Sequence, residues 1–545
     1  MTVIEAPGKD SVSTAATTPH GAKKQPPVLG RLFSGTLWLA LRTPLQVLFS
    51  LWTIPLILQA IGKMSGAYGF AWGFGFFQML FEFGMSSALQ RQVAERWTRG
   101  DRDGVDRAIA CGMNFYAAMA LVQMAALLGV AYVALPYSNY HGESYRLIVK
   151  LLWLQVATAP FYGLSAVLSS VLQAARRYDF MPRLEMAVVV LRFVILWGGV
   201  HAGVDFFAIV VAQTLAQIAL VIIPALWVVV GELGHVPHFG GARLEDYKSL
   251  IHISFYMFLV QLSVVLADKV DTAILGFATV DPDAANSVYL AVSKPFLQIR
   301  QTGWTLAYMV MPAVASLVAA RDEAALDRIK YDATRLHIAA LLPVGLLAAI
   351  YAGPFLTLWV GDKLGYDAAA EAPLLRLFLV ATIPLVLSVP VQAAFGMNKV
   401  EVVALAALGG ALVNLPLSYY LTRQLGVAGV IWGTVLTTLF SNLLIPGVYV
   451  FRVLKIRPRT FLARTVSAPA AAAAALGLTA LVLTMFPLHP SPKGGMSPAR
   501  WLPLGLHLAA CSLAYVVGYV ATPVGRTDLV EVAGKFLGRF RGKQG

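Results

Sequence analysis

Long apolar runs separated by short polar connections fill the chain from residue 32 to residue 523. A helix needs about 20 mostly apolar residues to cross the hydrocarbon core of a bilayer. The runs therefore predict an all-α polytopic membrane protein with about fourteen transmembrane helices. The predicted segments are 32–61, 66–90, 108–135, 147–174, 181–202, 205–231, 250–277, 287–319, 333–360, 373–396, 400–422, 427–451, 465–487 and 502–523.

The composition agrees with this pattern. Of the 545 residues, 58% are hydrophobic and 13% are charged, whereas a soluble protein carries about 25% charged residues. Residues 1–29 contain no apolar run, which predicts a disordered cytoplasmic tail rather than a signal peptide. The net charge of +14 lies mainly between apolar segments. That placement is typical of loops facing anionic lipid, so no nucleic-acid partner is expected.

The basic residues also predict the orientation in the membrane. The tails and loops on the side shared by both termini hold 29 of the 42 Lys and Arg residues, and the opposite loops hold 8. The positive-inside rule therefore places both termini in the cytoplasm, with 525–545 as a basic cytoplasmic tail.

The outer loops are too short and too poor in acids for a catalytic domain. The two longest contain one acidic residue, Glu143. A membrane-embedded glycosyltransferase or polymerase would need catalytic carboxylates in a sizeable outer loop, so the loops argue against that class of protein.

Three sequence matches at nearly constant spacing indicate an internal repeat. Their offsets are 221, 219 and 223 residues. They join Arg107 to Arg328, Gln173 to Gln392, and Gly203 to Gly426. Because six helices per copy is an even number, the copies share one orientation and are related by an axis along the membrane normal.

The repeat predicts how the chain divides. We expect an N-lobe over 30–231 (helices 1–6), a C-lobe over 232–455 (helices 7–12), and two added helices over 456–524. Two such lobes, with short loops and no phosphate-binding G-x-x-x-x-G-K-[ST] motif, predict an alternating-access transporter rather than an enzyme or an ATPase.

Charged residues within the predicted helices are the candidate site, because charge inside a bilayer is usually paired or lines a wet cavity. The basic residues are Arg42, Arg192, Lys269, Lys294 and Arg300. The acidic residues are Glu82, Asp268 and Asp271. The balance predicts a net positive cavity that favours an anionic substrate such as a phosphate or carboxylate. Arg300, Lys294, Arg192 and Arg42 are the candidate ligands of its headgroup.

The acids have a second set of candidate roles. Asp268, Asp271 and Glu82, together with Lys269, could couple transport to an ion or gate the cavity. Each also has a structural alternative. Glu82 and Arg42 lie at similar depth and could form a structural pair. The cluster at 268–271 could fasten helices together, and Lys294 could neutralise the carboxylates of that cluster. The sequence leaves these alternatives open. No cofactor is expected apart from a coupling Na⁺ or H⁺.

A polar stripe follows one face of the eighth segment. Its residues recur at spacings of four, three, four and three, which places them on one side of a helix. They are Lys294, Gln298, Gln301, Thr305 and Tyr308. Such a face in a membrane helix is expected to look into protein or water.

Three stretches together resemble a known family over roughly residues 30–455. They are LQAIGKMSGAYGFAWGFGFFQMLFEFGMSSALQRQVAE, DKVDTAILGFATVDPDAANSVYLAVSKPFLQI, and ALVNLPLSYYLTRQLGVAGVIWGTVLTTLFSN. The chain is similar to the polysaccharide transporters (O-antigen and exopolysaccharide flippases). These belong to the superfamily that also holds the multidrug and toxin extrusion (MATE) exporters.

The resemblance implies a MATE-like fold and a flippase in the bacterial inner membrane. Such a flippase moves polyprenyl-pyrophosphate-linked oligosaccharide to the periplasmic leaflet for surface polysaccharide biosynthesis. Its partners would be that lipid, membrane lipids and polysaccharide polymerase machinery. A lipid II flippase, which also has fourteen helices, is the nearest alternative. A cation-coupled multidrug exporter is a second one, disfavoured because the first helix carries Arg42 and no acid.

Overall fold

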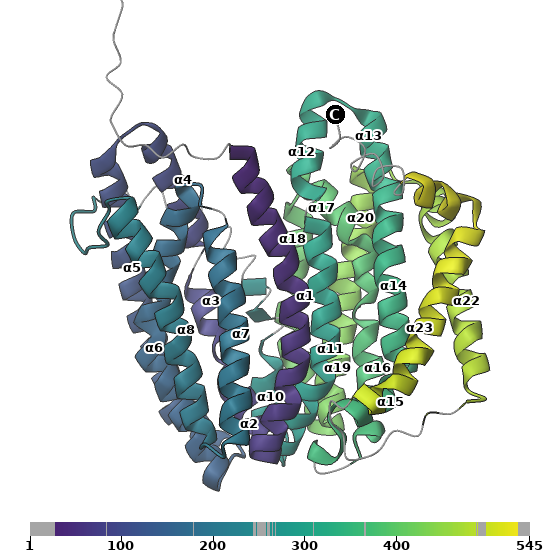
Figure 1. Cartoon of the computed structure of the whole chain (residues 1–545), viewed down its shortest axis with the longest axis horizontal. Coiled ribbons are helices and arrows are strands. Elements are labelled where there is room, and N and C mark those ends of the chain that lie inside the picture. Colours follow the sequence, from purple (N-terminus) through teal and green to yellow (C-terminus); the bar gives the residue numbers. More distant parts are fainter. Residues whose placement is uncertain are drawn as a thin grey trace, which may run out of the picture.

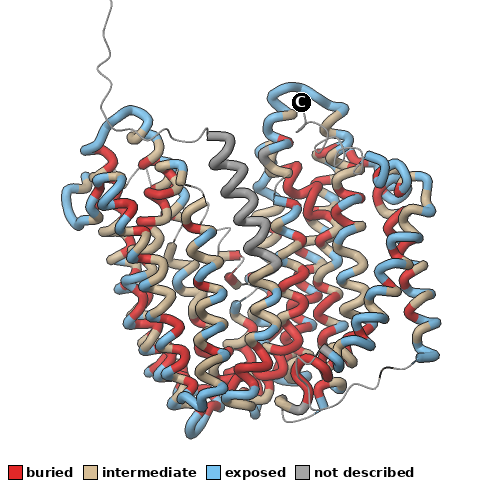
Figure 2. The backbone as a smooth tube through the Cα atoms, viewed as in Figure 1, coloured by how far each residue is buried: buried red, intermediate tan, exposed pale blue. Residues whose placement is uncertain are grey.

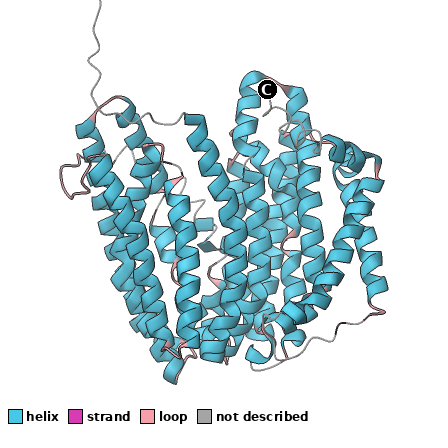
Figure 3. Cartoon of the chain, viewed as in Figure 1, coloured by secondary structure: helices cyan, strands magenta, loops and turns pink. Residues whose placement is uncertain are grey.

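The computed structural model describes 28–82, 84–177, 179–243, 247, 258, 262–263, 265–266, 269–308, 310–364, 367–486, 488 and 498–531. Side chains at 28–44, 312, 362, 364 and 498 are outside this description. All regular secondary structure in the described part is helical, as predicted (Figure 3).

Twelve helical stretches of the described part are long and apolar enough to cross a membrane. The difference from the predicted fourteen has two sources. One stretch, Leu45–Thr98, joins two predicted segments, and most of the predicted segment 250–277 lies outside the described residues. The chain is a multi-pass membrane protein.

The first half of the chain forms one group of helices, on the left in Figure 1. Short 3₁₀ and π segments extend or link several of them. The helices are α1 (Val28–Ile61), α2 (Ser65–Gly73), α3 (Phe76–Phe81), α4 (Met85–Thr98), α5 (Arg102–Gly129), α6 (Gly142–Ala174), α7 (Phe180–His201) and α8 (Phe206–Leu226).

The second half forms the other group, and the last two long helices pack on its outer side (Figure 1). The group contains α10 (Asp271–Ala278), α11 (Pro282–Tyr308), α12 (Val310–Ala320), α13 (Glu323–Arg328), α14 (Thr334–Ile350), α15 (Ala352–Trp359), α16 (Ala372–Val380), α17 (Ser388–Gly396), α18 (Glu401–Leu425), α19 (Val427–Thr438) and α20 (Ile445–Val453). It is followed by α21 (Pro458–Phe461), α22 (Ser467–Leu483) and α23 (Pro498–Ala521).

Helix α1 runs between the two groups and contributes to both cores. Ile54 and Leu58 are buried in the core of the second half, whereas Leu56 and Ile57 are buried in a core of the first half. Residues spaced by four lie on one helical face, and the intervening pair lies on another. The helix is therefore a wall shared by both halves.

The predicted segment 66–90 is not one helix, which corrects that expectation. The structure breaks it into α2, α3 and α4, with turns at 74–75 and around residue 84. Gly84 has φ of +68°, a left-handed conformation that other residues adopt at a cost. The glycines of GFGFF and FEFG in this segment were the signal for the breaks.

Turns at matching positions support the predicted repeat. Gly100 and Arg321, 221 residues apart, both have positive φ. Each is followed by an aspartate that caps the next helix: Asp101 accepts a hydrogen bond from the Gly104 amide, and Asp322 from the Ala325 amide. Gly203 and Gly426, 223 residues apart, likewise have φ of +68° and +58°.

One hydrogen bond joins the start of α2 to the start of α11. The hydroxyls of Ser65 and Ser287, which are 222 residues apart, lie 2.7 Å from each other. This separation in sequence is close to the offsets of the predicted repeat. The residue boundaries predicted for the lobes remain predictions.

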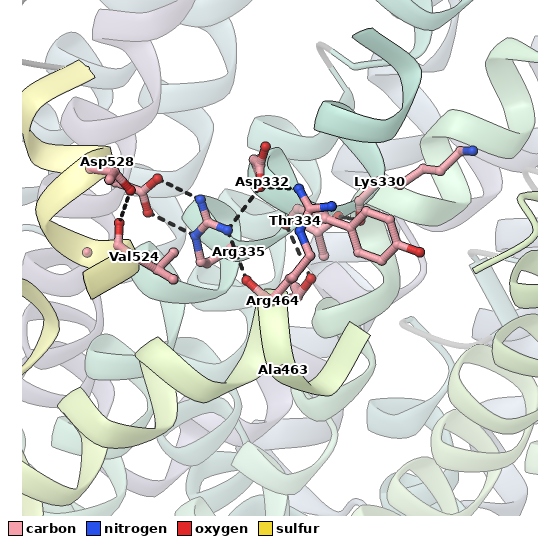
Figure 4. Close-up of polar contacts among 12 residues, drawn as sticks. Lys330, Asp332, Thr334, Arg335, Ala463, Arg464, Val524 and Asp528 are labelled. Carbon is pink, nitrogen blue, oxygen red and sulfur yellow. Dashed lines mark hydrogen bonds and ion pairs between the residues drawn. The ribbon is translucent and has the colours of Figure 1, made fainter. Parts of the chain in front are cut away.

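The last helices are attached through one arginine (Figure 4). The guanidinium of Arg335 donates to both carboxylate oxygens of Asp528, at 2.9 and 2.6 Å. It also donates to Asp332, at 3.0 Å, and to the carbonyl of Arg464, at 2.9 Å. Burial alone would raise the pKa of Asp528, but hydrogen bonds from Arg335 and Tyr519 and the arginine's charge hold it below its usual range.

Candidate functional site

A cavity of about 170 Å³ lies against the shared wall. Helices α1, α2, α7 and α8 line it. Its polar and aromatic lining is Gln46, Phe49, Ser50, Thr53, Tyr68, Arg192, Phe193, Phe206 and Gln213. Arginine, amide and aromatic side chains around one space are suited to an anionic group with a sugar attached.

Arg192 is the charged residue of this cavity. Its guanidinium lies 6.0 Å from the centre of the Trp72 ring, and its Nη1 donates to Gln217 at 3.3 Å. Gln213 donates to the Arg192 carbonyl at 2.6 Å and fixes the backbone beside α8. No carboxylate of the described part forms an ion pair with Arg192. Its charge is therefore available to a ligand.

The cavity reaches the second half of the molecule through α1. Ser50, which lines the cavity, accepts a hydrogen bond from Gln298 of the polar stripe at 3.1 Å. One residue on, the Leu51 carbonyl accepts from the Trp359 indole at 2.5 Å. The Arg192 cavity and the stripe on α11 thus meet at α1.

The polar stripe lies on α11 as expected, but its residues differ in environment. Gln298 is buried, Lys294 and Thr305 are half-buried, and Gln301 and Tyr308 are exposed. Arg300, beside the stripe, lies 5.4 Å from the centre of the Phe296 ring. Gln298 therefore contacts Ser50, which lines the same cavity as Arg192, whereas Gln301 and Tyr308 lie farther along the helix.

Lys294 does not neutralise the acids of the seventh segment in the described part of the chain. Its side chain interacts electrostatically with Lys269, a second cation. Lys269 is exposed, in a turn before α10. Asp268 lies outside the described residues, as does the side chain of Arg42. Lys294 lies in the middle of α11, and its electrostatic neighbour Lys269 precedes α10.

Asp271 is the buried acid, with 2% of its surface exposed. Its Oδ2 accepts hydrogen bonds from Tyr289, at 2.7 Å, and from Thr434, at 3.1 Å. Its Oδ1 has no hydrogen-bond partner in the described part of the structure. The residue opens α10, where the helix N-terminus favours negative charge. Neither Tyr289 nor Thr434 was predicted, because no sequence spacing links positions 163 residues apart.

Glu82 lies at the break between α3 and α4. It accepts a hydrogen bond from the Ser86 hydroxyl. The predicted pairing with Arg42 falls outside the described side chains. Glu82 lines a second cavity in the first half of the molecule, and it does not belong to the Arg192 cavity.

The two halves converge at the end that holds α2, α10 and the start of α11 (Figures 1 and 2). Besides the Ser65–Ser287 bond, the Ala67 amide donates to Asp283 at 3.1 Å and Asn139 donates to the Thr279 carbonyl at 2.6 Å. We call this region the seal. A Cβ built on Gly66 would overlap the Asp283 carbonyl oxygen, so the close approach requires glycine there.

Tyr140 closes the outer part of the seal. Its hydroxyl donates to the Pro282 carbonyl at 3.4 Å and accepts from Asn286 at 2.9 Å. Burial, and secondarily the charge of Asp283, raise the pKa of this hydroxyl well above its usual value. It therefore remains protonated and able to donate. The sequence did not predict this residue.

Comparisons with known proteins agree with the fold. A solved structure of "Lipid II flippase MurJ, inward closed conformation" is 14% identical, with a TM-score of 0.66, covering 91% of this chain and 100% of the other. An inward-facing MATE transporter of the MOP superfamily is 14% identical, with a TM-score of 0.60, covering 76% and 96%. These similarities indicate the MOP superfamily fold.

Sequence comparisons give the family. A protein described as "Uncharacterized membrane protein EpsK", from Bacillus subtilis (strain 168), is 24% identical over 449 residues, which is 77% of this chain and 83% of EpsK. The family model described as "Polysaccharide biosynthesis protein" matches residues 32–325, just over half of the chain. The chain has the same fold as the two solved transporters. By the match of the family model, it belongs to the polysaccharide biosynthesis protein family.

Proposed function

We propose that this protein is an ion-coupled, alternating-access flippase for polyprenyl-pyrophosphate-linked oligosaccharide in surface polysaccharide biosynthesis. The observation that carries the proposal is the cavity beside α1, where Arg192 faces aromatic and amide side chains and pairs with no described carboxylate. A pyrophosphate or acidic sugar would supply the missing negative charge.

The other predicted cations would extend the binding surface beyond the Arg192 cavity. Lys269 and Lys294 lie close enough for their charges to interact, and Arg300 follows on α11. Together with Arg42 they would draw an anionic headgroup along the inner face of the two lobes, while its lipid tail stays in the bilayer. The polymerase machinery would receive the headgroup on the other side.

The orientation predicted from the loops gives the transport state. With both termini in the cytoplasm, the seal at α2 and α11 lies on the periplasmic side of the inner membrane. The structure then corresponds to the state that receives substrate from the cytoplasmic leaflet. Opening of the seal would release the headgroup to the periplasm.

Asp271 is the proposed coupling group of the second half. A carboxylate with one oxygen bound by two hydroxyls and the other unpartnered in the described structure can take up a proton or a Na⁺ ion. It is positioned between α10, α11 and α19, so its charge state would affect how these helices pack.

Lipid II flipping is the alternative that the fold favours most, because the MurJ structure covers 91% of this chain, compared with 76% for the MATE transporter. Multidrug export is a third candidate, although a basic cavity disfavours cationic drugs. The three differ in the charge and size of the ligand that the cavity should accept.

Thermal unfolding of the purified full-length protein in nanodiscs would separate them. We expect a polyprenyl-pyrophosphate-linked oligosaccharide to raise the melting temperature, and Arg192→Gln to remove most of that rise. Arg99→Gln, a change of an exposed arginine on the connection after α4, is the control. Stabilisation by lipid II alone, or by a cationic dye alone, would contradict the proposed substrate.

A further inference from the structure

The first half of the molecule holds a second cavity, of about 50 Å³, separate from the Arg192 cavity. Helices α3, α5 and α6 line it, and its wall is of mixed polar and apolar character. Five polar side chains line it: Gln78, Glu82, Tyr116, Gln123 and Tyr162. The volume is sufficient for a few water molecules or a single small ion.

The break between α3 and α4 places the carboxylate there. Helix α3 ends at Phe81, Gly84 turns the chain with φ of +68°, and α4 begins at Met85. Glu82 lies between them, with its carbonyl accepting from the Met85 amide at 2.8 Å. Interrupted helices in membrane transporters commonly form ion sites, because their ends present backbone and side-chain oxygens.

The polar side chains around Glu82 are fixed in position. Tyr116 and Gln123 each have 7% of their surface exposed. The Tyr116 hydroxyl is buried and has no hydrogen-bond partner in good geometry within the described part of the chain, although Ser86 lies near it. Glycine at 163 allows α6 to approach Tyr116 closely, since a Cβ there would come within 2.9 Å of the Tyr116 Cβ.

The charge of Glu82 is not balanced by the described residues. Ser86 donates a hydrogen bond to it, and no basic side chain in the described part forms an ion pair with it. A carboxylate inside a membrane protein is costly unless a positive charge or a proton accompanies it. Carboxylate, hydroxyl and amide oxygens are the ligands that hard cations prefer.

We propose that the Glu82 pocket is a cation site of the first half, which takes a Na⁺ ion or a proton. This second proposal rests on the proposed function only in that transport is ion-coupled. It adds a cation site in the first half to the coupling group proposed at Asp271 in the second half. Neutralising Glu82 would allow α3 and α4 to approach α5, whereas a bare carboxylate would keep the pocket hydrated.

The test measures binding without any lipid-linked substrate. The full-length protein carrying Asp271→Asn, so that the second half does not contribute, is purified in nanodiscs. Its melting temperature is recorded as NaCl replaces choline chloride at constant ionic strength, and again as the pH falls. We expect Na⁺ or acid to raise the melting temperature, and Glu82→Gln to abolish most of that rise. Glu95→Gln, at an exposed acid of α4, should leave it unchanged.

The outcomes distinguish a cation site at Glu82 from a purely structural role of this residue. A rise with Na⁺ identifies the metal ion as the ligand, and a rise with acid alone identifies the proton. A full rise in Glu82→Gln would overturn the proposal. A second result would also overturn it. If Glu82→Gln lowers the melting temperature under all conditions, and adding Arg42→Gln restores it, Glu82 is the partner of Arg42 in an ion pair and not a cation ligand. If Glu82→Gln does not fold, Tyr116→Phe should still weaken the cation effect, and an unchanged effect would overturn the site.

Discussion

Asp271 acquires its role from side chains that are remote in sequence. Tyr289 and Thr434 reach its carboxylate from α11 and α19. Charge and position in an apolar run were sufficient to select Asp271 as a candidate. They could not provide its partners, since depth along a helix does not determine which way a side chain points. For the same reason the sequence left open whether Lys294 neutralises the carboxylates at 268–271, and of these Asp268 lies outside the described residues.

Tyr289→Phe tests the environment of Asp271. Removing a hydroxyl that donates to the carboxylate destabilises its charged form, so protonation should occur at higher pH. We expect the midpoint of the pH dependence of transport to move upward, with the melting temperature nearly unchanged. The measurement is the flipping rate in proteoliposomes across pH values. Tyr420→Phe, at an exposed tyrosine of α18, is the control. An identical pH profile would exclude Asp271 as the coupling group.

At the scale of elements, the apolar runs predicted the long helices, and turns at matching positions agree with the predicted repeat. The runs could not show where a helix is interrupted within the membrane. Segment 66–90 is continuous in hydrophobicity, yet glycines divide it into α2, α3 and α4. Both the Glu82 pocket and the seal depend on that division.

Gly66→Ala tests the seal between α2 and α11. The added methyl overlaps the Asp283 carbonyl, and such overpacking costs about 1–3 kcal/mol. Each 1.4 kcal/mol shifts the equilibrium toward the open seal roughly tenfold. A cysteine at buried Ala285, with Cys111 and Cys511 replaced by alanine, should react faster with an impermeant maleimide. Gly69→Ala is the matched control, because its Cβ would meet nothing within 4 Å. Equal labelling of both variants would show that the approach at Gly66 does not limit opening.

The attachment of the last helices depends on Asp528. Asp528→Asn removes the charged partner of Arg335, which should cost about 1.5–3 kcal/mol of stability. Because the folded pKa of Asp528 lies below its usual value, the stabilisation is present at neutral pH. It is lost as the pH falls through the folded pKa, so the two proteins should converge in acid.

Melting temperatures of wild type and Asp528→Asn across pH would check this expectation. Glu531→Gln, an exposed acid three residues farther on, controls for a general loss of negative charge. A difference between wild type and Asp528→Asn that persists unchanged in strong acid would show that the ion pair is not what holds these helices.

For the whole molecule, the sequence predicted the class, the repeat and the excess of intramembrane cations. The cavity itself could not be predicted. It requires α1, α2, α7 and α8 to meet, and Arg192 is one residue of a wall otherwise built from ordinary aromatic and amide side chains. The seal was equally hidden, because it consists of small and neutral polar residues such as Ser65 and Ser287.

The central claim is that this chain moves an anionic lipid-linked saccharide by means of its basic cavity. The most direct test is flipping of a fluorescent polyprenyl-pyrophosphate-linked sugar in liposomes by wild type, Arg192→Ala, Arg300→Ala and the exposed control Arg99→Ala. The account predicts flipping by wild type and Arg99→Ala. It predicts a loss of at least about tenfold, or roughly 1.4 kcal/mol, in Arg192→Ala, which changes the cavity, and in Arg300→Ala, which changes the cation on α11, while both remain folded. Equal flipping by all four proteins, or none by wild type with any anionic headgroup, would contradict it.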